Sequence, residues 1–139
     1  MTSMTQKKFN LEIITPGKVV FSGEAIRLQA PSTAGYFEIL YNHTPFLSAL
    51  KIGKIKVTAA AGKKYYAISG GFAEVYKNKV IILAETAEPS EEIEANRALA
   101  AKERAERRLL ERLPETDIPR ARVSLIRALN RLSVGRLGN

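Results

Sequence analysis

Arginine is the residue type in this 139-residue chain whose spacing could do chemistry. Arg97 and Arg104 are seven residues apart and Arg108 follows four residues later, so in a helix they share one face. Arg127 and Arg131 are four residues apart in a second segment. The guanidinium group offers a planar fork of donors that suits phosphate and carboxylate groups. If the two segments fold back on each other, these arginines converge and could hold a triphosphate without a glycine-rich loop.

Two carboxylates, Glu88 and Glu94, flank the start of the first arginine segment and could accept hydrogen bonds from an amine or a ribose hydroxyl. The alternative is that the arginines pair along their own helix with acids three or four residues away. Arg127 and Arg131 have no such partner, because no acidic residue follows Asp117. The pairs in this alternative are Arg97 with Glu94, Arg107 with Glu103 and Arg108 with Glu111.

Other chemistry has few residues available. The sequence has no cysteine, which excludes a disulfide scaffold, a zinc–thiolate site and a cysteine nucleophile. The single histidine, His43, lies in a turn-like loop, and Ser69 lacks the sequence pattern of a nucleophile turn. A metal site would have to be built from carboxylates. We therefore expect neither a catalytic centre nor a metal site.

Residues 8–84 have the pattern of β-strands. Phe9, Leu11 and Ile13 alternate with polar residues, so the strand they form has one buried face. Turn residues recur about every 8–10 positions, which is typical of an antiparallel sandwich or barrel. The turn signals are Pro16-Gly17, Ser22-Gly23, Ala34-Gly35, Gly53, Ala61-Gly62, Gly70-Gly71 and Lys77-Asn78. A part of roughly 80 residues suits two packed sheets.

Residues 90–134 instead have the pattern of two helices, because glycine is absent and small apolar residues recur every three or four positions. Ser90, followed by acidic residues, predicts the start of the first helix, which should end near Leu113-Pro114. Asp117 predicts the cap of the second helix, with Pro119 in its first turn. The apolar stripes are Ala98, Ala101, Ala105 and Leu109 in the first helix, and Ala121, Leu125, Ala128 and Leu132 in the second.

Together the two halves predict an α+β fold, an N-terminal antiparallel β-sandwich followed by a C-terminal antiparallel two-helix hairpin. The predicted domains are residues 1–87 and 88–139. The short connection between the helices favours antiparallel packing, and alanine stripes bury little area. Because helix stability comes mostly from packing, we expect a rigid β-domain that carries a hairpin able to undock.

The charge balance is basic. The chain has 22 Lys and Arg against 14 Asp and Glu, a net charge of +8. This suggests an anionic partner, and a nucleic-acid-binding module is one alternative. Against that alternative, Tyr65-Tyr66 is the only aromatic pair among basic residues, so we expect no nucleic acid partner. The longest uncharged stretches, about a dozen residues, are too short to span a membrane, and the N-terminus lacks the apolar region of a secretory signal.

Several segments occur in the same order in a known family. They are Leu11 to Pro16, Val19 to Gly23, Ile68 to Val75, Asn78 to Leu83, Arg97 to Leu109 and Leu129 to Val134. By these segments, and by its strands-then-helices order, the chain resembles the epsilon subunit of bacterial F-type ATP synthase over nearly its whole length. No single motif is decisive, but the order and spacing together are specific.

The resemblance implies a non-catalytic subunit of the rotary central stalk in a proton-translocating ATP synthase, at the cytoplasmic face of the cell membrane. The β-sandwich would bind the gamma subunit and the c-subunit ring, and the histidine of the family's lower loop is retained as His43. The hairpin would exist in a folded-down and an extended form. The extended form would lie beside gamma and the catalytic α/β subunits and inhibit ATP hydrolysis, its basic last helix meeting an acidic loop.

In bacillus-type members of this family, the folded-down form binds ATP through a motif of the form Ile/Leu-Asp-x-x-Arg-Ala. The matching stretch is Ile93 to Ala98, in which Glu94 stands where the family has Asp. The resemblance therefore implies ATP as a regulatory ligand and leaves the involvement of magnesium open. Carried over position by position, the ligands would be Glu88, Glu94, Arg97, Arg104, Arg127 and Arg131.

Overall fold

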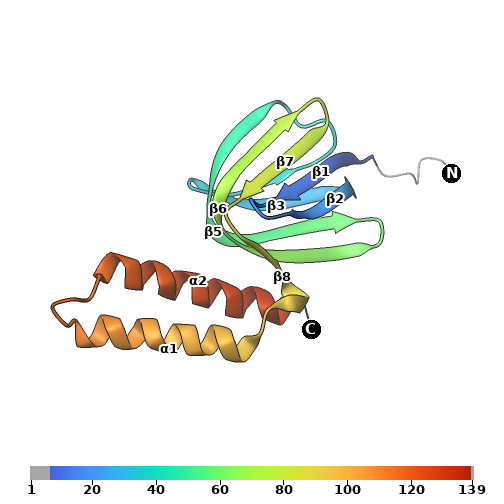
Figure 1. The fold of residues 1–139 in the computed structure, drawn as a ribbon. Helices are drawn as coiled ribbons and strands as arrows, with labels where there is room; N and C mark the ends of the chain where they lie inside the picture. Colours follow the sequence, from blue (N-terminus) through green and yellow to red (C-terminus); the bar gives the residue numbers. More distant parts are fainter. Residues whose placement is uncertain (1–6, 139) are drawn as a thin grey trace.

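A computed structural model describes residues 7–138 of the chain. Strands occupy the chain up to Pro89, and helices follow from Ser90 onward (Figure 1). The α+β organisation expected from the sequence is confirmed. Residues 1–6 and residue 139, with which the predicted domains 1–87 and 88–139 begin and end, lie outside the described residues.

The β-domain is built from an eight-stranded sheet that curls over itself into a sandwich (Figure 1). The strand order is β2-β1-β7-β6-β5-β3-β4, and β8 pairs with β6. β1 and β7 run parallel, while the other pairings described are antiparallel. The strands are β1 (Phe9–Ile14), β2 (Val19–Ala25), β3 (Arg27–Ser32), β4 (Gly35–Ile39), β5 (Phe46–Ala59), β6 (Gly62–Tyr76), β7 (Lys79–Ala84) and β8 (Ala87–Pro89).

The period-two pattern places the core where the sequence predicts it. Phe9, Leu11 and Ile13 on β1 are buried, and so are Ile55 and Val57 on β5. The long strands β5 and β6 pair along their whole length, from Phe46 opposite Val75 to Ala59 opposite Gly62. These two strands therefore connect the β3–β4 part of the sheet to the β7–β1–β2 part, which closes the core between them.

Three predicted turns lie inside strands instead, and the prediction was wrong at these positions. Tertiary packing explains why glycine is needed at two of them. A Cβ at Gly53 would lie 2.7 Å from Pro31 of the neighbouring strand β3. Gly71 has a φ of +146°, and a Cβ there would overlap the carbonyl oxygen of Leu83. The three positions are Gly23 in β2, Gly53 in β5 and Gly70-Gly71 in β6.

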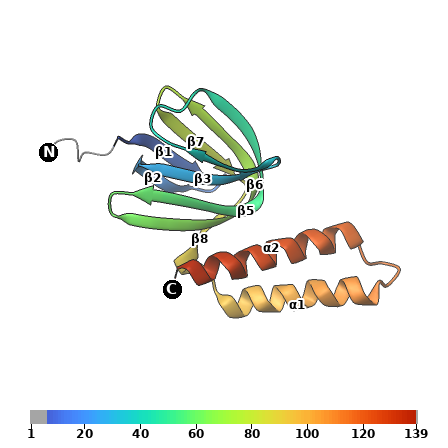
Figure 2. The same ribbon diagram turned by 180° about the vertical axis from the view of Figure 1, so that it is seen from behind.

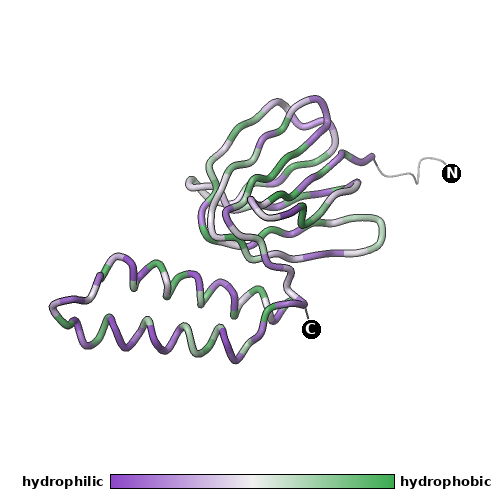
Figure 3. The backbone as a smooth tube through the Cα atoms, viewed as in Figure 1, coloured by the Kyte–Doolittle hydropathy of each residue, from purple (hydrophilic) through white to green (hydrophobic). Residues whose placement is uncertain are grey.

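The helical part consists of η2 (Ser90–Glu92), a short 3-10 helix, followed by α1 (Ala95–Glu111) and α2 (Ile118–Leu137). The two α-helices pack side by side as an antiparallel hairpin, with α2 between α1 and the β-domain (Figure 2). Their interface is an alanine stripe, as predicted, and hydrophilic residues recur along both helices (Figure 3). Its buried alanines are Ala98 and Ala105 on α1 and Ala121 and Ala128 on α2.

The ends of the helices follow the sequence signals only in part. Asp117 caps α2 as predicted, accepting a hydrogen bond from the backbone N–H of Arg120 at 3.0 Å. Ser90 does not start α1, however, because the α-helix begins at Ala95 with Glu94 as its N-cap residue. Ser90 is buried and its hydroxyl donates to Glu91, because the end of α2 packs directly against this turn.

Tyr66 on β6 marks the junction between the two parts. Its side chain is only 3% exposed. Burial of the phenol, together with the nearby charges of Glu91 and Glu92 on η2, raises the pKa of Tyr66 from 10.0 to about 12. The turn that leads into the hairpin is thus seated directly on the β-domain.

Candidate anion-binding site

The hairpin carries a basic cavity of about 250 Å³ along one of its flanks. The small side chains of the alanine stripe let the helices approach closely, so that longer side chains at the next positions line the flank. Four arginines and a serine line it, two arginines from α1 and two from α2. These residues are Arg104, Arg108, Ser124, Arg127 and Arg131. A cavity with this lining favours a phosphate or carboxylate ligand.

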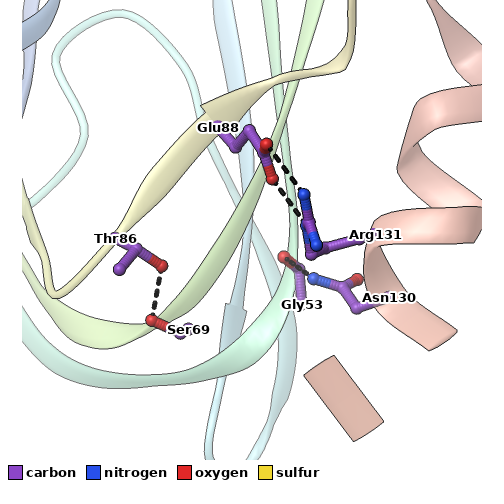
Figure 4. A network of polar contacts seen from close by, with 6 residues as sticks. All are labelled: Gly53, Ser69, Thr86, Glu88, Asn130 and Arg131. Atoms are coloured by element: carbon purple, nitrogen blue, oxygen red, sulfur yellow. Dashed lines mark hydrogen bonds and ion pairs between the residues drawn. The ribbon is translucent and has the colours of Figure 1, made fainter. Parts of the chain in front are cut away.

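Arg131 already has a partner on the β-domain. Its Nε and Nη2 groups donate to the two carboxylate oxygens of Glu88 on β8, at 2.8 and 3.1 Å (Figure 4). Both side chains are half-buried, at 28% and 32% exposure. The hydrogen bond that Arg131 donates to Glu88 is the main cause of the raised pKa of the Arg131 guanidinium, and the charges of Glu88 and Glu94 add to it. The pair is bidentate, which is the strongest geometry for an arginine and a carboxylate.

The neighbouring residue, Asn130, makes a second link to the β-domain. Its side-chain amide donates to the backbone carbonyl of Gly53 on β5, at 2.9 Å (Figure 4). Nearby, the hydroxyls of Ser69 and Thr86 are 2.6 Å apart and join β6 to the segment that leads into β8. One turn of α2 is therefore attached both to β5 and to β8.

The six residues predicted as ligands are only partly brought together. Arg104, Arg127 and Arg131 line the basic cavity, and Glu88 joins them through Arg131. Glu94 and Arg97 are exposed and do not line it. Glu94 still lies close enough to Arg131 to affect its pKa. Although Glu94 is the N-cap residue of α1, its carboxylate makes no capping hydrogen bond to the helix.

The ion pairs expected from the alternative interpretation are not formed. Within residues 7–138, the ion pair that runs along a helix is Lys102 with Glu106, at 3.7 Å. Arg97 and Arg107 thus have no ion pair with Glu94 and Glu103. Arg108 likewise has no ion pair with Glu111, and it lines the cavity instead. Spacing placed Arg108 on the helix face of Arg104, although the ligand set implied by the resemblance did not include it, whereas Ser124 carried no signal.

The β-domain has a second hollow, a cavity of about 730 Å³ with a mostly apolar lining. It lies where the end of β1 meets β5, β6 and β7. Phe72 and Leu83 line it and are 56% and 52% exposed. Lys51 and Glu85 add one charge of each sign to the lining. An exposed apolar hollow of this kind is typical of a site for a partner or ligand.

A third surface lies at the end of the β-domain that points away from the helices (Figure 1). Asn78, in the turn between β6 and β7, joins three segments there. Its side-chain oxygen accepts from the N–H of Asn42 at 2.7 Å, and its amide donates to the carbonyl of Lys8 at 2.9 Å. Lys7 lies over the ring of Tyr41 and Lys77 lies beside the ring of Tyr76. The result is a fixed basic and aromatic surface.

The residues considered for catalysis have structural neighbours. The Nδ1 atom of His43 is 2.8 Å from the carbonyl oxygen of Thr44, and its ring packs edge-on against Phe46. The hydroxyl of Ser69 is joined to that of Thr86. Within residues 7–138, no group of three or more histidines and acids is placed to hold a metal ion. Over the same range, no helix combines the length and the apolar character that crossing a membrane requires.

Comparison with protein families matches both parts of the chain. Residues 8–90 match the model described as ATP synthase, Delta/Epsilon chain, beta-sandwich domain. Residues 91–135 match the model described as ATP synthase, Delta/Epsilon chain, long alpha-helix domain. The two matches follow each other without a gap.

Individual relatives agree with these matches. The ATP synthase epsilon chain of Desulforapulum autotrophicum is 50% identical over 125 residues, covering 89% of this chain and 93% of the relative. The epsilon chain of Nitratidesulfovibrio vulgaris is 46% identical over 129 residues, covering 93% and 96%. Among solved structures, a chain of the Euglena gracilis mitochondrial ATP synthase has a TM-score of 0.77 at 23% identity, with 86% of this chain and 76% of that chain covered. That likeness is one of fold.

Proposed function

This chain belongs to the delta/epsilon family of ATP synthase subunits, and from that membership we propose that its helical hairpin regulates ATP hydrolysis by changing position. As a member it is a non-catalytic subunit of the central stalk. The observation that carries the proposal is the way the hairpin is attached. Among the described residues, the hairpin packs on β5 and β6 through α2, and α1 lies on the far side of α2 (Figure 2).

In the extended form, we propose that α2 lies beside the gamma subunit and the catalytic α/β subunits and blocks hydrolysis. The exposed side chains of α2 suit this role. Val123, Ile126 and Leu129 are 38%, 50% and 45% exposed in the compact form. The arginines of α2 have no acidic neighbour on their own helix after Asp117, so an acidic loop of a catalytic subunit would be a complementary partner.

In the compact form, we propose that ATP binds at the basic cavity and acts as a regulatory ligand. Arg104, Arg108 and Arg127 would hold the phosphates there, with Arg97 and Glu94 outside the cavity on the nearby part of α1. The cavity needs both helices, because each supplies two of its arginines. ATP would thus favour the compact form, since a ligand shifts an equilibrium by its differential affinity for the two states. Measuring ATP binding with and without magnesium tests whether the ion binds together with the phosphates.

The two surfaces of the β-domain suggest its partners in the stalk. We propose that the gamma subunit covers the apolar cavity, where Phe72 and Leu83 are exposed. The basic and aromatic end of the domain, which includes His43, would then meet the c-subunit ring. In this arrangement the subunit would couple rotation between gamma and the ring, as a peripheral protein on the cytoplasmic face of the membrane.

Truncation of the hairpin tests the proposal. We compare ATP synthase assembled with the full chain and with a chain that stops after Pro89, which keeps β8 in the sheet. We expect the truncated chain to assemble and ATP hydrolysis to rise, because the inhibitory helices are gone. Equal hydrolysis by the two complexes, with equal amounts of the subunit bound, would remove the inhibitory role.

A further inference from the structure

We propose that α2 holds the hairpin closed without any nucleotide, through a latch made of the Glu88–Arg131 ion pair and the hydrogen bond from Asn130 to Gly53. The inference rests on the proposed function only in assuming that the hairpin moves. It assigns Glu88 a different role from that of a nucleotide ligand. Glu88 is an internal partner that keeps Arg131, and with it α2, on the β-domain.

The contacts of the latch are short and well aligned. The guanidinium of Arg131 engages both oxygens of Glu88 at 2.8 and 3.1 Å, and Asn130 reaches the carbonyl of Gly53 at 2.9 Å. In Figure 4 the two residues of α2 extend toward the sheet from the same turn of the helix. The ion pair is half-buried, so solvent screens it less than an exposed pair.

The last turns of α2 also pack against η2 and Ile93, the segment that leads from the β-domain into the hairpin. A Cβ at Gly138 would lie 2.7 Å from the hydroxyl oxygen of Ser90, and one at Gly135 would lie 3.1 Å from the side chain of Ile93. Gly138 therefore allows the end of the helix to approach η2, and Gly135 allows it to approach Ile93, more closely than a side chain would. Val134, which directly precedes Gly135, is 1% exposed. The contacts with the β-domain and with η2 thus lie along one helix.

The first helix is not part of the latch. Figures 1 and 2 both place α1 on the side of α2 that faces away from the strands. The α-helix that packs on β5, β6 and η2 is α2. Release of α2 would therefore free the hairpin from the β-domain first, and separation of α1 from α2, which dismantles the basic cavity, would follow as a second step.

The latch also affects how a phosphate can use Arg131. Its Nε and Nη2 groups are engaged by Glu88, while the guanidinium still borders the basic cavity. A phosphate in the cavity would reach Arg131 through the remaining N–H groups or would have to break the ion pair. Arg104, Arg108 and Arg127 have no carboxylate within ion-pair distance in residues 7–138, so they are the open positions of the site.

Distance measurements on the full chain test the latch. Because the sequence has no cysteine, cysteines placed at the exposed positions Lys63 and Leu110 carry one fluorophore each. Energy transfer is measured during a titration with urea, in the absence of nucleotide. Urea increases the fraction of open hairpin, so the closed-to-open ratio can be measured even if nearly all molecules are closed in its absence. In the absence of urea we expect the single transfer efficiency of the closed hairpin, and we expect that value to change as the hairpin opens. Glu88→Gln should lower the closed-to-open ratio about fivefold.

Two further variants complete the test. Asn130→Ala should also lower the closed-to-open ratio about fivefold, because it removes the bond to Gly53. Glu24→Gln is the matched control, since Glu24 is exposed on β2 and lies outside the latch, and it should leave the ratio unchanged. An open hairpin in the unmodified chain without nucleotide would overturn the inference, and so would unchanged ratios in both latch variants. Neither readout involves ATP hydrolysis, so this outcome is independent of the truncation test.

Discussion

At the scale of residues, Arg131 has two roles. Its spacing in the sequence predicts that it lines the basic cavity, but does not predict its ion pair with Glu88. Arg131 lies beside Arg127 in the basic cavity because the two residues are four positions apart in a helix. Its partner Glu88 is 43 residues away in the chain. The pair exists because α2 packs on the sheet, and a pattern within one helix contains no information about that packing. The same reason hides the bond from Asn130 to Gly53.

The basic cavity leads to a prediction for single residues. Arg104→Ala and Arg127→Ala should each weaken ATP binding about tenfold, because each removes a charged donor that lines the cavity. Arg107→Ala is the matched control, since Arg107 is exposed and does not line it. Calorimetry with ATP, with and without magnesium, measures the affinities. Identical heats for the unmodified chain and the Arg104→Ala/Arg127→Ala double variant would show that these arginines do not bind ATP.

At the scale of elements, capping and turn residues predict the structure correctly where contacts within one element determine it. Asp117 was predicted as a cap and is one, since a cap needs only its own helix. Ser90 was predicted as a cap and is not, because the end of α2 packs against it. Gly53 was predicted as a turn, but a neighbouring strand requires the glycine. Tertiary contacts overrule local signals at both positions.

The seat of η2 on β6 gives a prediction for the dependence of stability on pH. Tyr66 has a pKa raised from 10.0 to about 12 in the folded chain, first by burial and then by Glu91 and Glu92. The folded state therefore holds its phenol proton more tightly than the unfolded state. This stability is fully present below pH 10 and is lost as the pH rises toward 12, by roughly 3 kcal/mol in all.

Unfolding in urea between pH 9 and pH 12 measures this loss, with Tyr66→Phe as the comparison. The free energy of unfolding should fall more steeply with pH in the unmodified chain than in the variant, because the variant has no phenol to ionise at this position. Parallel curves for the two proteins would show that Tyr66 ionises equally easily in the folded and unfolded states.

At the scale of the whole molecule, the sequence predicts the two parts better than their arrangement. The switch from period two to helical spacing was enough to predict a β-sandwich followed by a helical hairpin. The parallel pairing of β1 with β7 and the attachment of the hairpin through α2 depend on contacts distant in the sequence. That attachment is small, and a small attachment is what a movable hairpin requires.

A disulfide lock gives the most direct measurement of whether the position of the hairpin controls ATP hydrolysis. Ser90→Cys and Gly138→Cys place two cysteines at a contact where a Cβ would lie 2.7 Å from the serine oxygen. Oxidation should hold the hairpin closed in the assembled ATP synthase, and each single-cysteine variant is the control for oxidation itself. We predict faster ATP hydrolysis by the oxidised complex than by the same complex after reduction, because only the reduced hairpin can extend. Equal rates before and after reduction, with the disulfide shown to have formed, would contradict the account.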